Sequence, residues 1–173
     1  MLILLLMYSS ISYGQKFSSE KGAIVFFSDA DIEDIKAVNA VVGSLFNTTT
    51  GEIVYILKIR DFVFDNSLMR EHFNEKYLES EKYPKATFQG TITGFKENTN
   101  GLQKVKAVGK MTMHGVAKEV SIPGTIERID GKLVMKSKFR IKLQDYNIKI
   151  PKIVWQNIAE EVEVTVDIIY KPV

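Results

Sequence analysis

The sequence of 173 residues contains no cysteine, four prolines, one tryptophan and two histidines. Without cysteine, the chain has no thiol nucleophile, no thiolate metal site and no disulfide, so its fold depends on core packing and backbone pairing. A strong charge of one sign is also lacking, because 23 basic residues are balanced by 21 acidic ones and the net charge is +2. This balance argues against a nucleic-acid partner, which requires a basic patch.

Long apolar runs are lacking except at the N-terminus, where residues 1–7 read MLILLLM. That run is much shorter than the ~20 apolar residues of a membrane span. It is followed by small residues at Ser12 and Gly14, as at a signal peptidase site. We therefore predict a secretory signal at residues 1–14, one mature domain at residues 15–173, and a periplasmic or secreted protein. The alternative interpretation of the apolar run is a buried first strand.

Motifs of catalysis and cofactor binding are absent as well. The sequence contains no GxSxG, HExxH, P-loop or GxGxxG pattern. We therefore expect no catalytic residue, no cofactor and no metal, and we predict that the protein is not an enzyme. His114 is interpreted as a turn residue with a local hydrogen bond. His72, between Glu71 and Glu75, is expected on a solvated helix face, with a weak surface metal contact as the alternative.

What the sequence does contain is alternation of apolar and polar residues, which predicts β-strands. One helix interrupts them: Asn66 or Ser67 can cap it, and Tyr83-Pro84 ends the segment. Turns are expected at His114-Gly115 and at Asp130-Gly131, a favoured hairpin pair. The predicted strands cover residues 23–28, 35–46, 52–64, 85–95, 104–114, 116–122, 133–143 and 161–170.

About eight antiparallel strands and one short helix predict an all-β fold that removes its sheet edges by closing into a barrel. An eight-stranded barrel is just wide enough to be filled by side chains or to hold one small ligand. The alternation does not decide between these two outcomes.

Several short motifs carry a resemblance to a known family. They are Tyr83-Pro84 followed by Phe88 and Gly90, the run Met113-His114-Gly115-Val116 with Lys118, Phe139, and Asp145-Tyr146. In this order the chain resembles the YceI-like family of secreted lipid- and polyisoprenoid-binding proteins. The resemblance implies a lipocalin-like barrel around an apolar tunnel, which binds a polyisoprenoid or fatty-acid-like chain without catalysis.

Alternation then selects the residues of that tunnel. The predicted lining is Phe88, Val105, Met111, Met113, Met135, Phe139 and Ile141, whose alternative role is ordinary core packing. A basic stripe runs along one strand as Lys132, Lys136, Lys138, Arg140 and Lys142. It is interpreted either as a solvated strand face or, through Lys138 and Arg140, as a contact for a lipid headgroup.

The leading functional hypothesis is transport or sequestration of an amphiphilic lipid such as an isoprenoid. The alternatives are a filled barrel that acts as an exported protein-interaction module and, more remotely, an enzyme that acts on a lipid held in the barrel. A transient membrane contact and a homodimer are left open.

Overall fold

The computed structural model describes residues 16–29, 34–149 and 160–173. The predicted signal at residues 1–14 lies outside them. So does most of residues 148–159, for which the sequence predicts an irregular segment or a short helical turn after Pro151. The strands are β1 (Lys16–Ser28), β2 (Ile35–Asn39), β3 (Val42–Asn47), β4 (Glu52–Lys58), β5 (Val63–Phe64), β6 (Lys85–Thr93), β7 (Gln103–Met113), β8 (Val116–Ile129), β9 (Lys132–Lys142) and β10 (Glu161–Pro172). The helical segments are η1 (Ile59–Asp61), α1 (Ser67–His72), η2 (Phe73–Tyr77) and η3 (Leu143–Tyr146).

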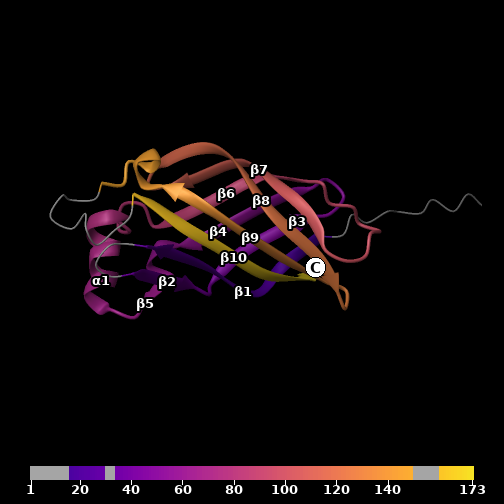
Figure 1. Ribbon diagram of the computed structural model, residues 1–173, viewed down its shortest axis with the longest axis horizontal. Coiled ribbons are helices and arrows are strands. Elements are labelled where there is room, and N and C mark those ends of the chain that lie inside the picture. Colours follow the sequence, from indigo (N-terminus) through magenta and orange to yellow (C-terminus); the bar gives the residue numbers. More distant parts are fainter. Residues whose placement is uncertain (1–15, 30–33, 150–159) are drawn as a thin grey trace, which may run out of the picture.

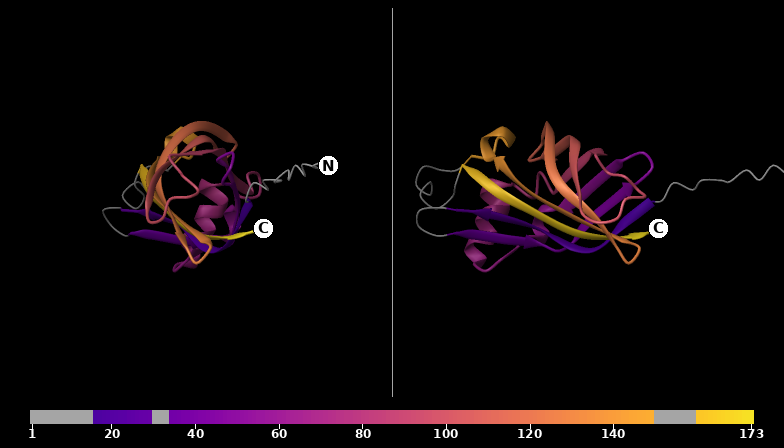
Figure 2. Two further views of the ribbon diagram at one scale, coloured as in Figure 1. Left: turned by 90° about the vertical axis from the view of Figure 1, so that its right-hand side faces the viewer. Right: turned by 45° about the vertical axis from the view of Figure 1, so that its right-hand side comes forward.

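The strands form one antiparallel sheet that closes on itself. Its order is β10-β9-β8-β7-β6-β4-β3-β1, and β10 pairs with β1 to complete a ring of eight strands. Figure 1 shows the barrel from the side, and the left view of Figure 2 shows the ring with α1 across its far end. The predicted all-β, eight-stranded antiparallel barrel with one short helix is therefore confirmed. Among the described residues, no helix is long and apolar enough to span a membrane.

Of the two remaining strands, β2 precedes β3 and β5 follows β4, each across a short break. The prediction that residues 35–46 and 52–64 are single continuous strands is wrong at these breaks. One side chain lies at both breaks. Asn39 is fully buried, its Oδ1 accepts a hydrogen bond from the N–H of Val41 at 2.9 Å, and its Nδ2 donates to the Lys58 carbonyl at 2.9 Å. The amide thus satisfies backbone groups that a continuous ladder would otherwise pair.

The hairpin turns lie where the sequence predicts them. His114-Gly115 joins β7 to β8 with φ of 51° and 74°, and Asp130-Gly131 joins β8 to β9 with φ of 49° and 77°. Two consecutive residues with positive φ match the twist of the strands that they connect. The strand after the first turn is longer than predicted and reaches Ile129 instead of Ile122.

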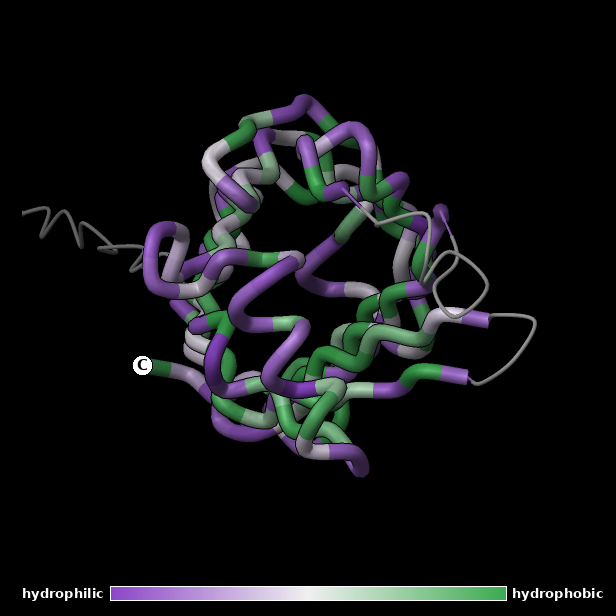
Figure 3. The backbone as a smooth tube through the Cα atoms, turned by 90° about the vertical axis from the view of Figure 1, so that its left-hand side faces the viewer, coloured by the Kyte–Doolittle hydropathy of each residue, from purple (hydrophilic) through white to green (hydrophobic). Residues whose placement is uncertain are grey.

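The helical segment begins as predicted at Asn66, whose Oδ1 accepts hydrogen bonds from the N–H groups of Leu68 and Met69. The regular helix ends at His72, and a π-turn follows in which the Leu78 N–H donates to the Phe73 carbonyl at 2.9 Å. This wider turn places Phe73 and Tyr77 among the buried residues. The helix therefore covers one end of the barrel with apolar side chains, the end that faces the viewer in Figure 3.

The opposite end of the barrel is filled with side chains. Its core residues are each at most 1% exposed: Phe17, Phe46, Ile53, Ile126, Leu133, Ile168 and Tyr170. The Arg128 guanidinium lies 5.6 Å from the centre of the Phe17 ring at this end. Each such side chain contributes about 1.5–3 kcal/mol through burial. This packed end supplies much of the stability that a chain without disulfides requires.

Candidate functional site

A cavity occupies the half of the barrel between the packed end and the helix. The space open to the centre of a water-sized sphere is about 210 Å³, and it communicates with solvent. Its wall is built mainly from apolar side chains of the strands, α1, η2 and η3. The packed-end residues Phe17, Phe46, Ile53 and Tyr170 do not contribute to this wall. The barrel is thus filled at one end and hollow at the other, an outcome that alternation left open.

All seven side chains predicted to line a tunnel contribute to the cavity wall: Phe88, Val105, Met111, Met113, Met135, Phe139 and Ile141. They come from β6, β7 and β9, whose inner faces meet across the hollow. Phe88, Val105 and Met135 are buried, whereas the other four are only half-buried. That these residues contact a ligand stays a prediction.

Four phenylalanines close the cavity at the helix end. The ring of Phe73 stacks on Phe26 at 5.3 Å between centroids and lies 4.9 Å from Phe64 and 5.5 Å from Phe62. All four rings contribute to the cavity wall. Aromatic pairs at these distances add to the free energy of burial. The cluster holds the helix on the barrel and gives the cavity an apolar end wall.

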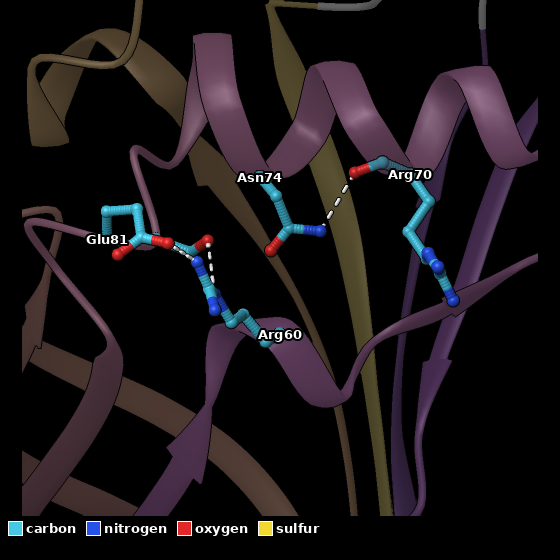
Figure 4. A network of polar contacts seen from close by, with 5 residues as sticks. Arg60, Arg70, Asn74 and Glu81 are labelled. Atoms are coloured by element: carbon cyan, nitrogen blue, oxygen red, sulfur yellow. Dashed lines mark hydrogen bonds and ion pairs between the residues drawn. The ribbon is translucent and has the colours of Figure 1, made fainter.

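Polar contacts also join the segment that follows η2 to η1 of the barrel (Figure 4). Arg60 of η1 forms an ion pair with Glu81, and its Nε donates to Ser80 Oγ at 3.4 Å. Asn74 Nδ2 donates to the Arg70 carbonyl at 2.8 Å within the helical segment. Since Arg60 and Glu81 are both well exposed, their ion pair stabilises little, and the apolar cluster is the main attachment.

Tyr55 brings a phenol to the cavity wall next to the packed end. Its hydroxyl donates to Met135 Sδ at 3.1 Å, while the neighbouring Tyr170 hydroxyl bonds to Ser44 Oγ at 2.6 Å. Burial raises the pKa of Tyr55 to about 12 and raises the pKa of Tyr170 well above its usual value. Both phenols are therefore neutral at physiological pH, and this part of the cavity carries no charge.

The basic stripe lies on the outer face of β9. Lys136, Lys138 and Lys142 form ion pairs across to β10, with Asp167, Glu163 and Glu161 at 3.2, 2.7 and 3.5 Å. Arg140 is exposed on the same face, between Lys138 and Lys142. Lys138 and Arg140 thus point away from the cavity, and their role as headgroup contacts stays a prediction.

His114 bridges two distant segments. Its Nδ1 donates to the Tyr146 carbonyl at 2.9 Å, and its Nε2 lies 2.7 Å from Glu79 Oε2. The prediction of a local turn hydrogen bond is wrong, because these partners are 32 and 35 residues away. The histidine fastens η3 to the β7–β8 turn. His72 is half-buried on α1, and the described residues contain no group of three His, Cys, Asp or Glu side chains that could hold a metal.

Sequence reasoning missed the part of the wall near the helix: Phe26, Tyr55, Phe62, Phe64 and Tyr77. The first four lie in nearly continuous apolar runs, where period-two alternation does not separate the inner face from the outer. Tyr77 and Phe73 share one face of the helical segment. The apolar character of that face could have been used to predict that both side chains pack against the barrel.

Comparisons with known proteins agree with this geometry. The YceI-like domain family matches residues 6–170. A polyisoprenoid-binding domain from Saccharophagus degradans, implicated in plant cell wall breakdown, is 15% identical, with a TM-score of 0.78 over 91% of this chain and 98% of its own. BcnA from Burkholderia cenocepacia is 17% identical, with a TM-score of 0.73 over 86% of this chain and 95% of its own.

The YceI protein of Campylobacter jejuni is 16% identical, with a TM-score of 0.57 over 100% of this chain and 92% of its own. At these identities the structural likeness shows a shared fold. No curated protein matches this sequence.

Proposed function

The chain belongs to the YceI-like family, and from that premise we propose that it binds a long-chain amphiphilic lipid, of the polyisoprenoid or fatty-acid kind, in its barrel cavity. The observation that carries this proposal is an apolar cavity, open to solvent, in a barrel whose other end is filled. Lys136 also reaches the wall, but its ammonium group lies 3.2 Å from Asp167 on the outer face. The similar domain from Saccharophagus degradans, described as polyisoprenoid-binding, supports the same ligand class.

The size of the cavity sets the length of chain that it holds. A volume of 210 Å³ is many times the roughly 10–15 Å³ that one water-sized group needs, so the cavity has room for a hydrocarbon chain. With about 0.3 kcal/mol for each buried heavy atom, a chain of about 18 carbons binds with at least ~5 kcal/mol, a Kd of ~0.1 mM or tighter. An isoprenoid longer than the cavity would leave part of its chain outside.

Binding, transport or sequestration fits this site better than the alternatives. A barrel filled throughout, as a pure interaction module requires, disagrees with the cavity. We propose a non-enzymatic role, since a wall that is mainly apolar favours a lipid chain by burial alone. We also propose export to the periplasm or beyond, supported by the apolar residues 1–7 with Ser12 and Gly14.

Native mass spectrometry tests the proposed function. Protein purified without detergent is expected to carry an added mass that extracts into organic solvent as a long-chain amphiphile. Protein refolded from denaturant without lipid is then offered prenols of increasing length, and uptake is expected to reach a plateau near the length that fills the cavity. A lipid-free protein that takes up none of these prenols contradicts the proposal.

A further inference from the structure

The barrel wall is incomplete between β8 and β9. These strands pair only from Ile129 and Lys132 to Gly124 and Ser137. Beyond that point, residues 116–123 pair with β7 alone and residues 138–142 with β10 alone, so within the described part of the chain two strand edges lack a partner.

The end of this ladder has a chemical cause. Pro123 has no N–H to donate, and a proline within a sheet belongs where pairing stops. The Ser137 hydroxyl donates to the Pro123 carbonyl at 2.6 Å, in place of a further backbone bond. The cavity reaches this seam, because its wall includes Ile122 and Pro123 on β8 and Phe139 and Ile141 on β9. The cavity therefore extends to the stretch where β8 and β9 are unpaired, which is called the side opening below.

The far end of the side opening is fixed by η3. This segment contacts both β8 and β9, and the hydrogen bond from His114 Nδ1 to the Tyr146 carbonyl ties it to the β7–β8 turn. The side opening thus extends from Pro123 and Ser137 to η3.

One lysine lies on the inner face of β8 beside the side opening. Lys118 is directly opposite Met111 on β7, so the two Cβ atoms leave the sheet on the same side. Met111 contributes to the cavity wall, which places Lys118 on the inner face.

The inner-face positions of β8 from 116 to 128 are buried or half-buried, with Lys118 the one exposed exception. The ion pairs found among the described residues leave Lys118 out.

We propose that Lys118 binds the anionic head of the amphiphile, a phosphate, diphosphate or carboxylate, whose chain lies in the cavity. The inference rests on the proposed function and names the class of headgroup. A charged head stays in water while the chain is buried, and the side opening is where the two environments meet. Lys118 is exposed, and a lysine at such an edge can lay its stem along apolar surface while its ammonium group stays in water as a point charge for an anion. Lys138, by contrast, is on the outer face and already pairs with Glu163.

The test compares two ligands with the same chain, geranylgeraniol and geranylgeranyl diphosphate, by isothermal titration calorimetry on lipid-free protein. We expect the wild type to prefer the diphosphate, and we expect added salt to weaken the preference. Lys118→Gln is expected to reduce the preference about tenfold, a typical loss for a hydrogen bond to a charged group, while leaving the affinity for geranylgeraniol nearly unchanged. Inorganic diphosphate alone is expected to compete poorly, because it lacks the chain.

The matched control is Lys106→Gln, since Lys106 is exposed on β7 at an outer-face position. Circular dichroism and melting temperature confirm that each variant is folded. If both ligands bind and Lys118→Gln keeps the full preference, or if Lys106→Gln lowers it equally, the inference is refuted and the proposed function stands. If the wild type binds neither ligand, the proposed function fails and the inference with it.

Discussion

Ala107→Phe should shorten the chain that the protein can hold. Ala107 lies half-buried on the inner face of β7, where its neighbours on the same face are Val105 and Gly109. Its side chain contributes to the cavity wall. The new ring adds roughly six carbon atoms beyond Cβ to the hollow, and at about 0.3 kcal/mol for each displaced ligand atom the loss is ~1.8 kcal/mol. A chain that fills the wild-type cavity should therefore bind about twentyfold more weakly.

The assay is a titration of lipid-free protein with alcohols of increasing chain length, from chains that leave space in the cavity to chains that fill it. Affinity for the short alcohols should be nearly unchanged, because the cavity has room for both the ring and a short chain. The length at which affinity stops rising should fall by about six carbons. The matched control is Val108→Phe, whose position on the outer face is 45% exposed.

Folding must be checked in parallel. An added ring in a fully packed core costs about 1–3 kcal/mol, whereas a ring that enters an existing cavity should cost less. The reasoning is refuted if folded Ala107→Phe keeps the wild-type length dependence, or if Val108→Phe shifts that dependence by the same amount.

Four further predictions follow from the same structure. Met113→Lys, which places a charge on the cavity wall, should weaken chain binding more than Lys138→Glu does on the outer face, and equal binding by folded variants would reject this assignment. Burial raises the pKa of Tyr55 from 10 to about 12, so the stabilisation by its neutral phenol is complete below pH ~10 and is lost as the pH rises through ~12. Tyr55→Phe should therefore lessen the fall of the urea midpoint at alkaline pH, and an unchanged fall would contradict this prediction. His114→Ala should lower the free energy of unfolding by about 1–2 kcal/mol, and a wild-type urea curve would argue against its two bonds. Intact mass of the protein from its native host should lack residues 1–14, and a full-length cytoplasmic product would overturn the proposed export.

The strands that build most of the cavity could be predicted because they are regular. In β7 and β9 the alternation of apolar and charged residues is nearly complete, so Met111, Met113 and Phe139 fall on the inner face without further information. The hairpin turns could also be predicted, because they depend on local sequence. Asp130-Gly131, for example, favours its turn by backbone conformation alone.

What escaped prediction depends on contacts between residues far apart in sequence. The Asn39 amide interrupts two strands through a bond to Lys58, and His114 joins Glu79 to Tyr146. The alternation of apolar and polar residues does not predict such bonds. Lys118 is different, because it is a charged residue at a position of its strand where the alternation predicts an apolar inner-face residue. Its unusual place could have been recognised from the sequence.

The central claim is that a lipid chain occupies the hollow half of the barrel. Nuclear Overhauser contacts between the protons of bound geranylgeraniol and the labelled methyl groups of methionine test it directly, because Met69, Met111, Met113 and Met135 all contribute to the cavity wall. We predict contacts from these four methyl groups and, in a sample that is also labelled at leucine methyls, none from the exposed Leu102. Saturating prenol without a contact to any of the four methionines would contradict it.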